Sequence, residues 1–437
     1  MIEPRTLPGF MELLPSDQVL FNNIKDTIKR NYEKFGFLPL DTPVLESSEV
    51  LLAKAGGETE KQIYQFKKGD NDLCMRFDLT VPLAKYVAAN YNELSFPFAR
   101  YQIDKVYRGE RPQKGRFREF YQCDIDVIGR GELSLAYDAE IPCIMYNIFK
   151  ELNIGDFTIQ ISNRKLLLGI IEDLGLNDLS IELLRLIDKK SKIGDENFIN
   201  TLRIDYKVDE QKLNVLLSFL NIKGSVNEQL SKLNKLGITN EKYVLGLKEL
   251  TTVIGFIQKF GVNAEYYTID LTIARGLDYY TGTVYETFIK GYENIGSVCS
   301  GGRYDNLAEY YTKEKLPGVG MSIGLTRLFY QLKENGLLKK QYMSNSKCIV
   351  LPMGEEYLEN CIALGNTLRA NNINTTTYLD NAKFKTKLQY AIRSKVKYAI
   401  FVGEDEVKGN YYTIKDLENE KQEQLTLDKL LEILTKD

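Results

Sequence analysis

The sequence predicts an α+β chain built on an antiparallel sheet, with a helical insertion and a separate α/β domain near its C-terminal end. Three observations indicate this. Residues 98–128 and 266–300 each contain consecutive strand patterns without the intervening helices of βαβ units. Residues 163–260 are rich in Leu, Ile, Lys and Glu at helical spacing, with little Gly. Beyond residue 347, strand and helix patterns alternate.

Length and composition fit this arrangement. The 437 residues are enough for two or three domains, and a hydrophobic content of 43% allows a substantial core. The net charge of -3 gives the chain no overall basic character, so contacts with nucleic acid must come from local patches. No apolar run approaches the length of a membrane span, and the first residues lack the pattern of a secretory signal. We therefore expect a cytoplasmic protein without membrane contact.

The chain contains no histidine, and its six cysteines show no CxxC spacing. A structural zinc site is therefore not expected, and the thiols are expected to be buried and free in a reducing compartment. The lack of histidine also excludes a Ser–His or Cys–His pair and an imidazole general base. Any catalysis must use carboxylates, Arg, Lys, Tyr, backbone amides or groups of the substrate.

The first element is a helix over residues 16–33, because Leu20, Ile24 and Ile28 recur every four residues on one face. Gly36 ends it, and an extended segment with two prolines follows.

Two strands that flank a basic loop come next, within residues 98–128. Gln122, Asp124 and Asp126 point to one side of the second strand, while the residues between them can enter a core. The polar face of the first strand consists of Arg100, Gln102, Asp104 and Arg108. Such a face is either the floor of a ligand site or a solvated surface, and the spacing alone does not decide between them.

The stretch Ala274–Glu286 reads ARGLDYYTGTVYE. Arg275 keeps its charge at any working pH, which suits an oxyanion that develops during a reaction. Tyr279 and Tyr280 offer hydroxyls on rigid rings, which suit a small planar ligand. The alternative is an ordinary strand and turn with exposed tyrosines.

The remaining elements are predicted from apolar runs and their breaks. Around the stretch 274–286 we expect strands at Tyr266–Ala274, Thr283–Ile289 and Ile295–Ser300. The C-terminal domain is expected to contain strands at Cys348–Met353 and Lys397–Glu404 with a helix at Glu355–Asn371. It also has a basic stretch that either binds RNA phosphates or is simply solvated, formed by Lys383, Lys385, Lys387, Arg393, Lys395 and Lys397.

Four blocks resemble the histidyl-tRNA synthetases, a family of class II. The stretch 274–286 resembles their histidine-specific signature, Arg108–Gln122 their motif 2, Gly320–Arg327 their motif 3 and Gly36–Glu46 their motif 1. The blocks fall in family order and span nearly the whole chain. The resemblance implies a class II antiparallel sheet flanked by helices. The domains it implies are the first part of the catalytic core at 1–162, a helical insertion domain at 163–262, the second part of the core at 263–334, a linker at 335–346 and an α/β anticodon-binding domain at 347–437.

The resemblance also implies an activity, namely the ATP-dependent attachment of L-histidine to tRNA-His through a histidyl-adenylate. ATP is then a substrate, Mg²⁺ accompanies it, and the enzyme is expected to be a homodimer. It would load tRNA with an amino acid that it does not itself contain. One alternative is a catalytically inactive, synthetase-like regulatory subunit of histidine biosynthesis that binds a phosphoribosyltransferase. Another is an RNA-binding stress sensor on the same fold.

Matching the family motifs residue by residue assigns the catalytic and ATP-binding roles. Arg108 is expected to hold the α-phosphate, and Arg275 occupies the place of a catalytic arginine. Arg327 is expected near the γ-phosphate and the adenine. Glu110 is expected to meet the adenine amino group and Phe120 to stack on the ring, although core packing is the alternative for Phe120.

The resemblance also implies a histidine site and a tRNA contact. The histidine site consists of Asp78, Thr80 and Gln122 for the ammonium group and of Asp126, Tyr279 and Tyr280 around the imidazole. Asp78 taken alone would be an ordinary helix cap. Many relatives carry Glu at the position of Asp126, and many carry His where this chain has Tyr121. Gln113 and Arg116, in the motif 2 loop, are candidates for reading the acceptor stem, with a solvated hairpin tip as the alternative.

Overall fold

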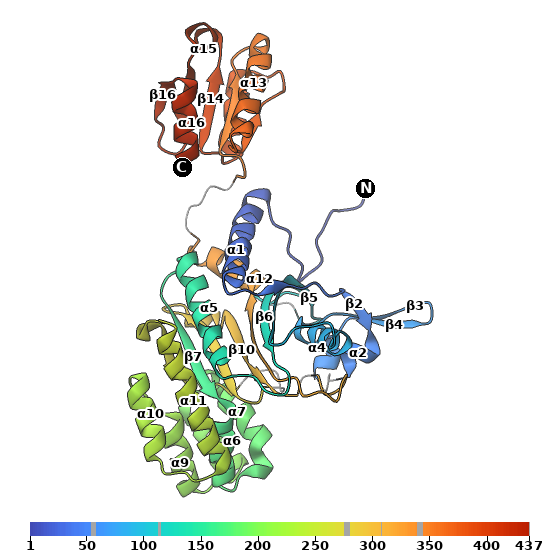
Figure 1. Ribbon diagram of the computed structural model, residues 1–437, viewed down its shortest axis with the longest axis vertical. Coiled ribbons are helices and arrows are strands. Elements are labelled where there is room, and N and C mark those ends of the chain that lie inside the picture. The colour runs from blue at the N-terminus through green and yellow to red at the C-terminus, as the bar shows by residue number, and fades with distance from the viewer. Residues whose placement is uncertain (54–57, 112–114, 275–279, 307, 339–343, 437) are drawn as a thin grey trace. The chain divides into compact units, whose positions relative to one another are not determined.

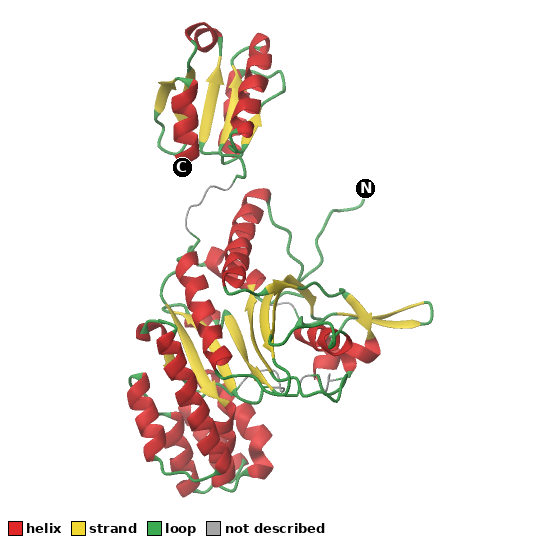
Figure 2. Cartoon of the chain, viewed as in Figure 1, coloured by secondary structure: helices red, strands yellow, loops and turns green. Residues whose placement is uncertain are grey.

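The computed structural model describes residues 1–53, 58–111, 115–274, 280–306, 308–338 and 344–436. The chain divides into two compact units, one of Met1–Met11 with Lys25–Leu337 and one of Glu12–Ile24 with Leu338–Asp437. The division runs through the first helix, α1 (Pro15–Lys34). Figure 1 labels the elements, and Figure 2 shows both units built from helices and strands. The predicted α+β class with an antiparallel sheet is confirmed.

An eight-stranded sheet lies at the centre of the larger unit, in the order β1-β5-β6-β11-β10-β9-β7-β8. All neighbouring pairs are antiparallel except β1 with β5 and β7 with β8. Its strands are β1 (Leu38–Pro39), β5 (Phe98–Tyr107), β6 (Glu119–Ile128), β7 (Phe157–Asn163), β8 (Tyr267–Ile269), β9 (Thr283–Ile289), β10 (Cys299–Tyr304) and β11 (Gly318–Gly324).

The apolar face of this sheet is covered by helices. Cys123, Ile125 and Val127 of β6 are buried, as their alternation with polar residues predicts. The helices α5 (Ala136–Leu152) and α12 (Leu325–Glu334) pack against the central strands.

A small second sheet precedes the central strands in sequence. Its order is β2-β4-β3, with β2 (Leu45–Ser47), β3 (Gln65–Lys68) and β4 (Asn71–Met75). The helices of this region are α2 (Ser48–Leu52), α3 (Glu58–Gln62) and α4 (Thr80–Ala89). The buried Arg76, just after β4, donates to the carbonyl oxygen of Lys105 on β5 at 2.8 Å and so joins the small sheet to the large one.

The segment predicted to be a helical insertion consists of helices joined by short turns after Asn163, the last residue of β7. Its helices are α6 (Arg164–Asp173), α7 (Ser180–Ile193), α8 (Asp195–Asn200), α9 (Glu210–Leu220), α10 (Val226–Lys235) and α11 (Glu241–Lys259). Leu213, Leu216 and Leu220 are buried, so the leucine stripe of α9 packs in the core of this bundle.

The smaller unit contains a five-stranded mixed sheet in the order β13-β12-β14-β15-β16. Its strands are β12 (Cys348–Pro352), β13 (Thr375–Thr377), β14 (Tyr398–Val402), β15 (Tyr412–Asp416) and β16 (Gln422–Leu425). Its helices are α13 (Leu358–Ala370), α14 (Phe384–Arg393), α15 (Glu404–Gly409) and α16 (Leu427–Lys436). The expected alternation of strands and helices is therefore present.

Two predicted boundaries are wrong. The strand expected at Ile295–Ser300 begins only at Cys299, because residues 293–295 form a 3₁₀ turn and Gly296 follows with a φ of 78°. The strand expected over residues 266–274 is limited to β8. In both cases an apolar run continues through a turn that hydrophobicity alone does not reveal. The helix expected from Glu355 is confirmed, with a 3₁₀ turn as its first part before α13.

Lys387 also departs from the sequence interpretation. Its side chain is 3% exposed, and its ammonium donates to the carbonyl oxygen of Pro352 at 2.9 Å. Lys387 is therefore a structural cation between α14 and β12 and belongs to neither a solvated face nor an exposed RNA-binding stripe.

A cluster of three donors around Glu151 ties α1 to α5. The carboxylate accepts hydrogen bonds from Arg30 at 2.8 Å, Asn31 at 2.8 Å and Lys34 at 3.1 Å. These donors, Arg30 first, lower the pKa of Glu151 from 4.5 to about 2. Since the folded pKa lies below the unfolded value, the stabilisation is complete above pH 4.5 and disappears as the pH falls toward 2.

We therefore expect Glu151→Gln to lower the free energy of unfolding at pH 7 by about 1 kcal/mol, as for other partly exposed charge networks. The difference from the unsubstituted protein should shrink between pH 4.5 and 2. Urea unfolding at several pH values measures it, and a difference that stays constant over this range would contradict the assignment.

Candidate active site

A cavity of about 1370 Å³ lies over the polar face of the large sheet. Every predicted site residue that the structure describes lines it, namely Asp78, Thr80, Arg108, Glu110, Arg116, Phe120, Gln122, Asp126, Tyr280 and Arg327. Arg275, Tyr279 and Gln113 lie outside the described residues. Residues that are up to 249 positions apart in the sequence thus line one cavity. The roles implied by the resemblance require this proximity.

The register of β5 and β6 builds the floor of this cavity. Arg100 lies opposite Asp126, and Gln102 lies opposite Asp124. Facing residues of an antiparallel pair point to the same side of the sheet, so both strands contribute to one polar surface. Arg100, Gln102, Asp124 and Asp126 are all buried. Of the two interpretations that the sequence left open, the solvated surface is therefore excluded.

Asp126 is held by partners on both oxygens. Its Oδ2 lies 2.7 Å from Nη2 of Arg100, and the hydroxyl of Tyr304 donates to its Oδ1 at 2.8 Å. A Cβ on Gly320 would lie only 2.1 Å from Oδ1 of Asp126, so only glycine fits at position 320 on the neighbouring strand. Burial raises the pKa of Asp126 to about 6, although Arg100 and Tyr304 oppose that shift.

Asp124 is a second floor acid that the sequence analysis placed on the right face but did not select as a site residue. It lines the cavity at 2% exposure, and its Oδ1 has no hydrogen-bond partner among the described residues. Gln122 donates to Ser322 at 2.8 Å, while its own Oε1 also lacks a partner within the described part of the chain. Because buried acceptors are normally paired, two unpaired ones on a cavity floor fit a ligand with N–H donors.

Burial also raises the pKa of Asp124 to about 7, with Arg100 acting in the opposite direction. A carboxyl whose folded pKa lies above its unfolded value of 3.8 makes the protein less stable as the pH rises from about 4 to 7.

Asp124→Asn is therefore expected to raise the thermal midpoint at pH 8, with an upper limit of roughly 4 kcal/mol in the free energy of unfolding. The gain should fall toward zero near pH 4. Calorimetry at both pH values measures this. A variant that is less stable than the unsubstituted protein at pH 8 would show that ionised Asp124 is satisfied in the folded state.

Asp78 has two roles in the structure. Its Oδ1 accepts from the backbone N–H of Val81 at 3.0 Å, so it does cap the start of α4. It also lines the cavity beside Thr80, and burial raises its pKa. A buried acid that lines the cavity is suited to an ammonium group.

The guanidinium of Arg108 lies between two aromatic rings. Its Cζ is 4.3 Å from the ring centroid of Phe77 and 5.1 Å from that of Phe120, and its Nε donates to the carbonyl oxygen of Phe77 at 3.2 Å. Phe120 is half-buried and lines the cavity, so core packing is not its only role. The two rings fix the direction in which this cation can bind an anion.

Two further cations line the same cavity. Arg327, in the first turn of α12, donates to the carbonyl oxygen of Ile295 at 2.6 Å. Arg116 lies 3.6 Å from Glu110 and is exposed. Guanidiniums and buried acids in one cavity allow a phosphate and an amine to bind together.

The cysteines, possible metal ligands and long helices of the described residues bear on further expectations from the sequence. The six cysteines are buried and free, and no group of three Cys, Asp or Glu side chains within the described ranges could hold a metal ion. Among the helices that the structure describes, none combines the length and apolar character needed to cross a membrane.

Comparison with known proteins identifies the family. The histidyl-tRNA synthetase model matches residues 9–328, and an anticodon binding domain model matches residues 347–437. A histidine--tRNA ligase of Clostridium tetani is 54% identical over 99% of this chain and 98% of its own length. The crystal structure of a histidyl-tRNA synthetase from Nostoc sp. PCC 7120 is similar with a TM-score of 0.93 at 39% identity, covering both chains completely.

A more distant structure shares the fold. An ATP phosphoribosyltransferase regulatory subunit/histidyl-tRNA synthetase from Bacillus halodurans C has a TM-score of 0.73 at 22% identity, covering 92% of this chain and 98% of its own. At that identity the likeness extends to the fold alone.

An antiparallel sheet with arginines and acids on its open face, joined to an anticodon-binding domain, defines an aminoacyl-tRNA ligase of class II. The chain belongs to the histidyl-tRNA synthetase family, which confirms the resemblance inferred from its motifs.

Proposed function

We propose that the chain attaches L-histidine to tRNA-His in two steps, with ATP consumed in the first. The observation that carries this proposal is the cavity floor, where acceptors of Asp124 and Gln122 that have no partner among the described residues share one space with the guanidinium of Arg108. An amino acid with a donor-bearing ring and an activated phosphate match these two sets of groups.

In the first step, an oxygen of the histidine carboxylate attacks the α-phosphorus of ATP, and pyrophosphate leaves. Negative charge grows on the phosphoryl oxygens, so fixed cations and correct positioning lower the barrier. The contacts of Arg108 with Phe77 and Phe120 at the cavity wall support its proposed binding of the α-phosphate. Arg275 supplies the second cation of this step, and Arg327 binds the outer phosphates. Mg²⁺ would enter with ATP and neutralise part of the charge on its phosphates.

Histidine is selected by groups on the floor. Asp78 and Gln122 take the ammonium, while Asp126, Tyr279 and Tyr280 surround the imidazole. Asp126 is already bonded on both oxygens, so Asp124 supplies the additional acceptor on the floor. A competing amino acid that leaves these buried acceptors unpaired loses roughly 10⁴-fold in efficiency, so editing is not required.

In the second step, a hydroxyl of the terminal ribose of tRNA attacks the activated carboxyl carbon. Its proton passes to a phosphate oxygen of the adenylate, which leaves as AMP, so no imidazole is needed. Gln113 and Arg116 of the motif 2 loop contact the acceptor stem, and the C-terminal unit binds the anticodon arm.

We also propose that the enzyme acts as a cytoplasmic homodimer. In the class II family, motif 1 lies at the dimer interface, and here the motif 1 segment contains the exposed side chains of Leu38 (61%) and Leu45 (46%). Apolar side chains of this exposure fit burial against a second copy.

Exchange of labelled pyrophosphate into ATP tests the proposed activity. Exchange should require L-histidine and fail with the other amino acids, and charging of tRNA-His should follow. A folded sample without histidine-dependent exchange would favour the regulatory-subunit alternative instead.

A further inference from the structure

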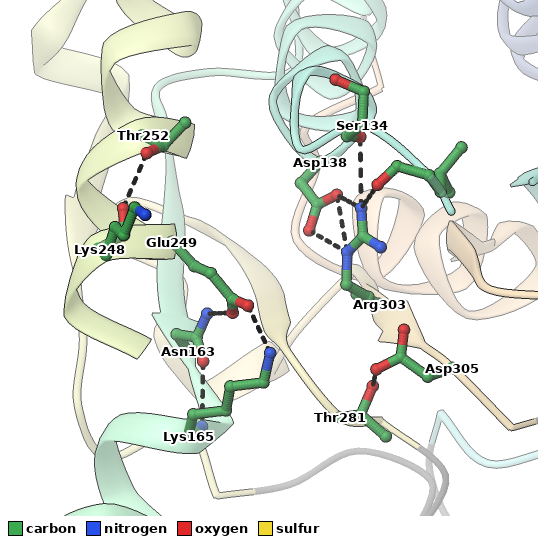
Figure 3. A network of polar contacts seen from close by, with 11 residues as sticks. Ser134, Asp138, Asn163, Lys165, Lys248, Glu249, Thr252, Thr281, Arg303 and Asp305 are labelled. Atoms are coloured by element: carbon green, nitrogen blue, oxygen red, sulfur yellow. Dashed lines mark hydrogen bonds and ion pairs between the residues drawn. The ribbon is translucent and has the colours of Figure 1, made fainter. Parts of the chain in front are cut away.

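A buried ion pair behind the cavity connects three segments of the catalytic unit (Figure 3). Arg303 of β10 is 6% exposed, and its Nε and Nη2 donate to the two carboxylate oxygens of Asp138 at 3.0 and 2.6 Å. The same Nη2 donates to the carbonyl oxygens of Leu133 at 3.0 Å and Ser134 at 3.3 Å. One guanidinium therefore fixes β10 to the first turn of α5 and to the loop before it.

The segment that carries Tyr280 is attached to this pair. The backbone N–H of Thr281 donates to the carbonyl oxygen of Arg303 at 2.8 Å, and the Thr281 hydroxyl donates to Asp305 at 2.6 Å. A Cβ on Gly302 would lie 2.9 Å from Cδ1 of Tyr280, so the Tyr280 ring rests on bare backbone beside Arg303. Any shift of residues 302–303 must therefore move the Tyr280 ring at the cavity wall.

A second anchor holds the other side of the segment. The N–H of Arg164 donates to the carbonyl oxygen of Gly282 at 2.9 Å, at the end of β7. The buried Asn163 donates to Glu249 of α11 at 2.8 Å, and Lys165 forms an ion pair with the same carboxylate (Figure 3). Residues 280–282 thus lie between an anchor in the sheet and an anchor in the helical insertion.

We infer that Arg303 and Asp138 are positioning residues for Tyr280 and thereby set the affinity for the amino acid. This inference rests on the proposed function, in which Tyr280 reads histidine. A buried ion pair adds little net stability because desolvation of its charges offsets their attraction. The effect of this pair on the positions of the segments is larger, because the planar guanidinium of Arg303 contacts three acceptor groups at once. A lysine ammonium cannot reproduce these contacts.

Steady-state exchange kinetics of Arg303→Lys test the inference. The KM for histidine should rise about tenfold, while the KM for ATP should change less than about twofold, because Arg108 and Arg327 are held by other contacts. A purely structural role would instead lower the amount of active enzyme and leave both KM values unchanged.

A double-mutant cycle with Tyr280→Phe then tests whether Arg303 acts through Tyr280. Non-additive effects on the histidine KM support this. If Arg303→Lys already misplaces the Tyr280 hydroxyl, removing that hydroxyl with Tyr280→Phe should add little further effect. Additive effects, or equal increases in both KM values, would overturn the inference. If Arg303→Lys does not fold, Thr281→Val serves in its place, because it removes only the hydroxyl bond to Asp305 and should raise the histidine KM in the same selective way.

Glu151→Gln is the matched control. It breaks a charge cluster between α1 and α5, and neither Glu151 nor its three donors are among the described residues that line the cavity, so it should reduce stability and leave both KM values unchanged. Failure of the unsubstituted enzyme to exchange with histidine would contradict the proposed function. Normal exchange with no selective change in Arg303→Lys would contradict only the positioning role.

Discussion

Arg108→Ala is expected to lower the rate of histidine-dependent pyrophosphate exchange by about 10² to 10³-fold, with a much smaller loss of ATP affinity. The guanidinium is held by Phe77 and Phe120 before any ligand arrives, so it stabilises the charge that develops on phosphorus without reorganisation. Its benefit therefore appears mainly in kcat. Single-turnover kinetics with saturating ATP and a separate ATP titration measure the two quantities.

Arg130→Ala provides the control for this prediction. Arg130 also lies over an aromatic ring, with its Cζ 4.7 Å from the centroid of Tyr91, but it is exposed and is not among the residues that line the cavity. Its removal should leave exchange unchanged. Arg108→Lys keeps the charge but loses the planar contact, and an intermediate rate is expected. Near-normal exchange in Arg108→Ala would exclude its role at the α-phosphate.

Asp126→Asn is expected to raise the KM for histidine by about 10²-fold and to destabilise the protein. The neutral side chain leaves the buried guanidinium of Arg100 without its ion-pair partner, and loss of one member of a buried pair typically costs about 3–5 kcal/mol. The bond from Tyr304 can still form, so the floor should remain assembled. Exchange kinetics and thermal unfolding of the same preparation measure both effects.

Asp124→Asn is a matched comparison at the neighbouring floor position. It should also raise the histidine KM, but it should raise the thermal midpoint rather than lower it. If both variants raise the histidine KM but change the thermal midpoint in opposite directions, Asp126 is the acid that also stabilises the fold. Asp124 is then the acid that serves ligand binding alone. Equal stability changes in the two variants would contradict the different hydrogen bonding of the two carboxyls.

The floor of the site was predictable from the sequence because side chains alternate strictly along a strand. The alternation placed Gln122, Asp124 and Asp126 on one face of β6 and Arg100 on the same face of β5, and the register confirms this. The cationic part needed the resemblance, since nothing in the local pattern distinguishes Arg108 or Arg327 from surface arginines. Each is placed by a turn or helix start whose position depends on the whole fold.

Other features could not be predicted because they depend on contacts between distant segments. Arg303 and Asp138 are 165 positions apart, and neither has a local pattern that indicates a partner. Asp126 was expected to meet the imidazole, but its bonds to Tyr304 and Arg100 could not be predicted because both partners come from other strands. Lys387 was interpreted from a charge run, whereas its burial results from the packing of α14 on the five-stranded sheet of the smaller unit.

In the proposed function, the carboxyl of Asp124 is expected to make histidine binding a proton-linked event. Burial raises the pKa of Asp124 to about 7, and a bound N–H donor favours its charged form. Binding should then release a proton to solvent, so the heat of binding should depend on the ionisation enthalpy of the buffer. Mild acidification should weaken amino-acid capture, while the fold itself gains stability from the same protonation. An enzyme whose chain lacks imidazole groups is thus expected to respond to pH in the range where imidazole normally titrates.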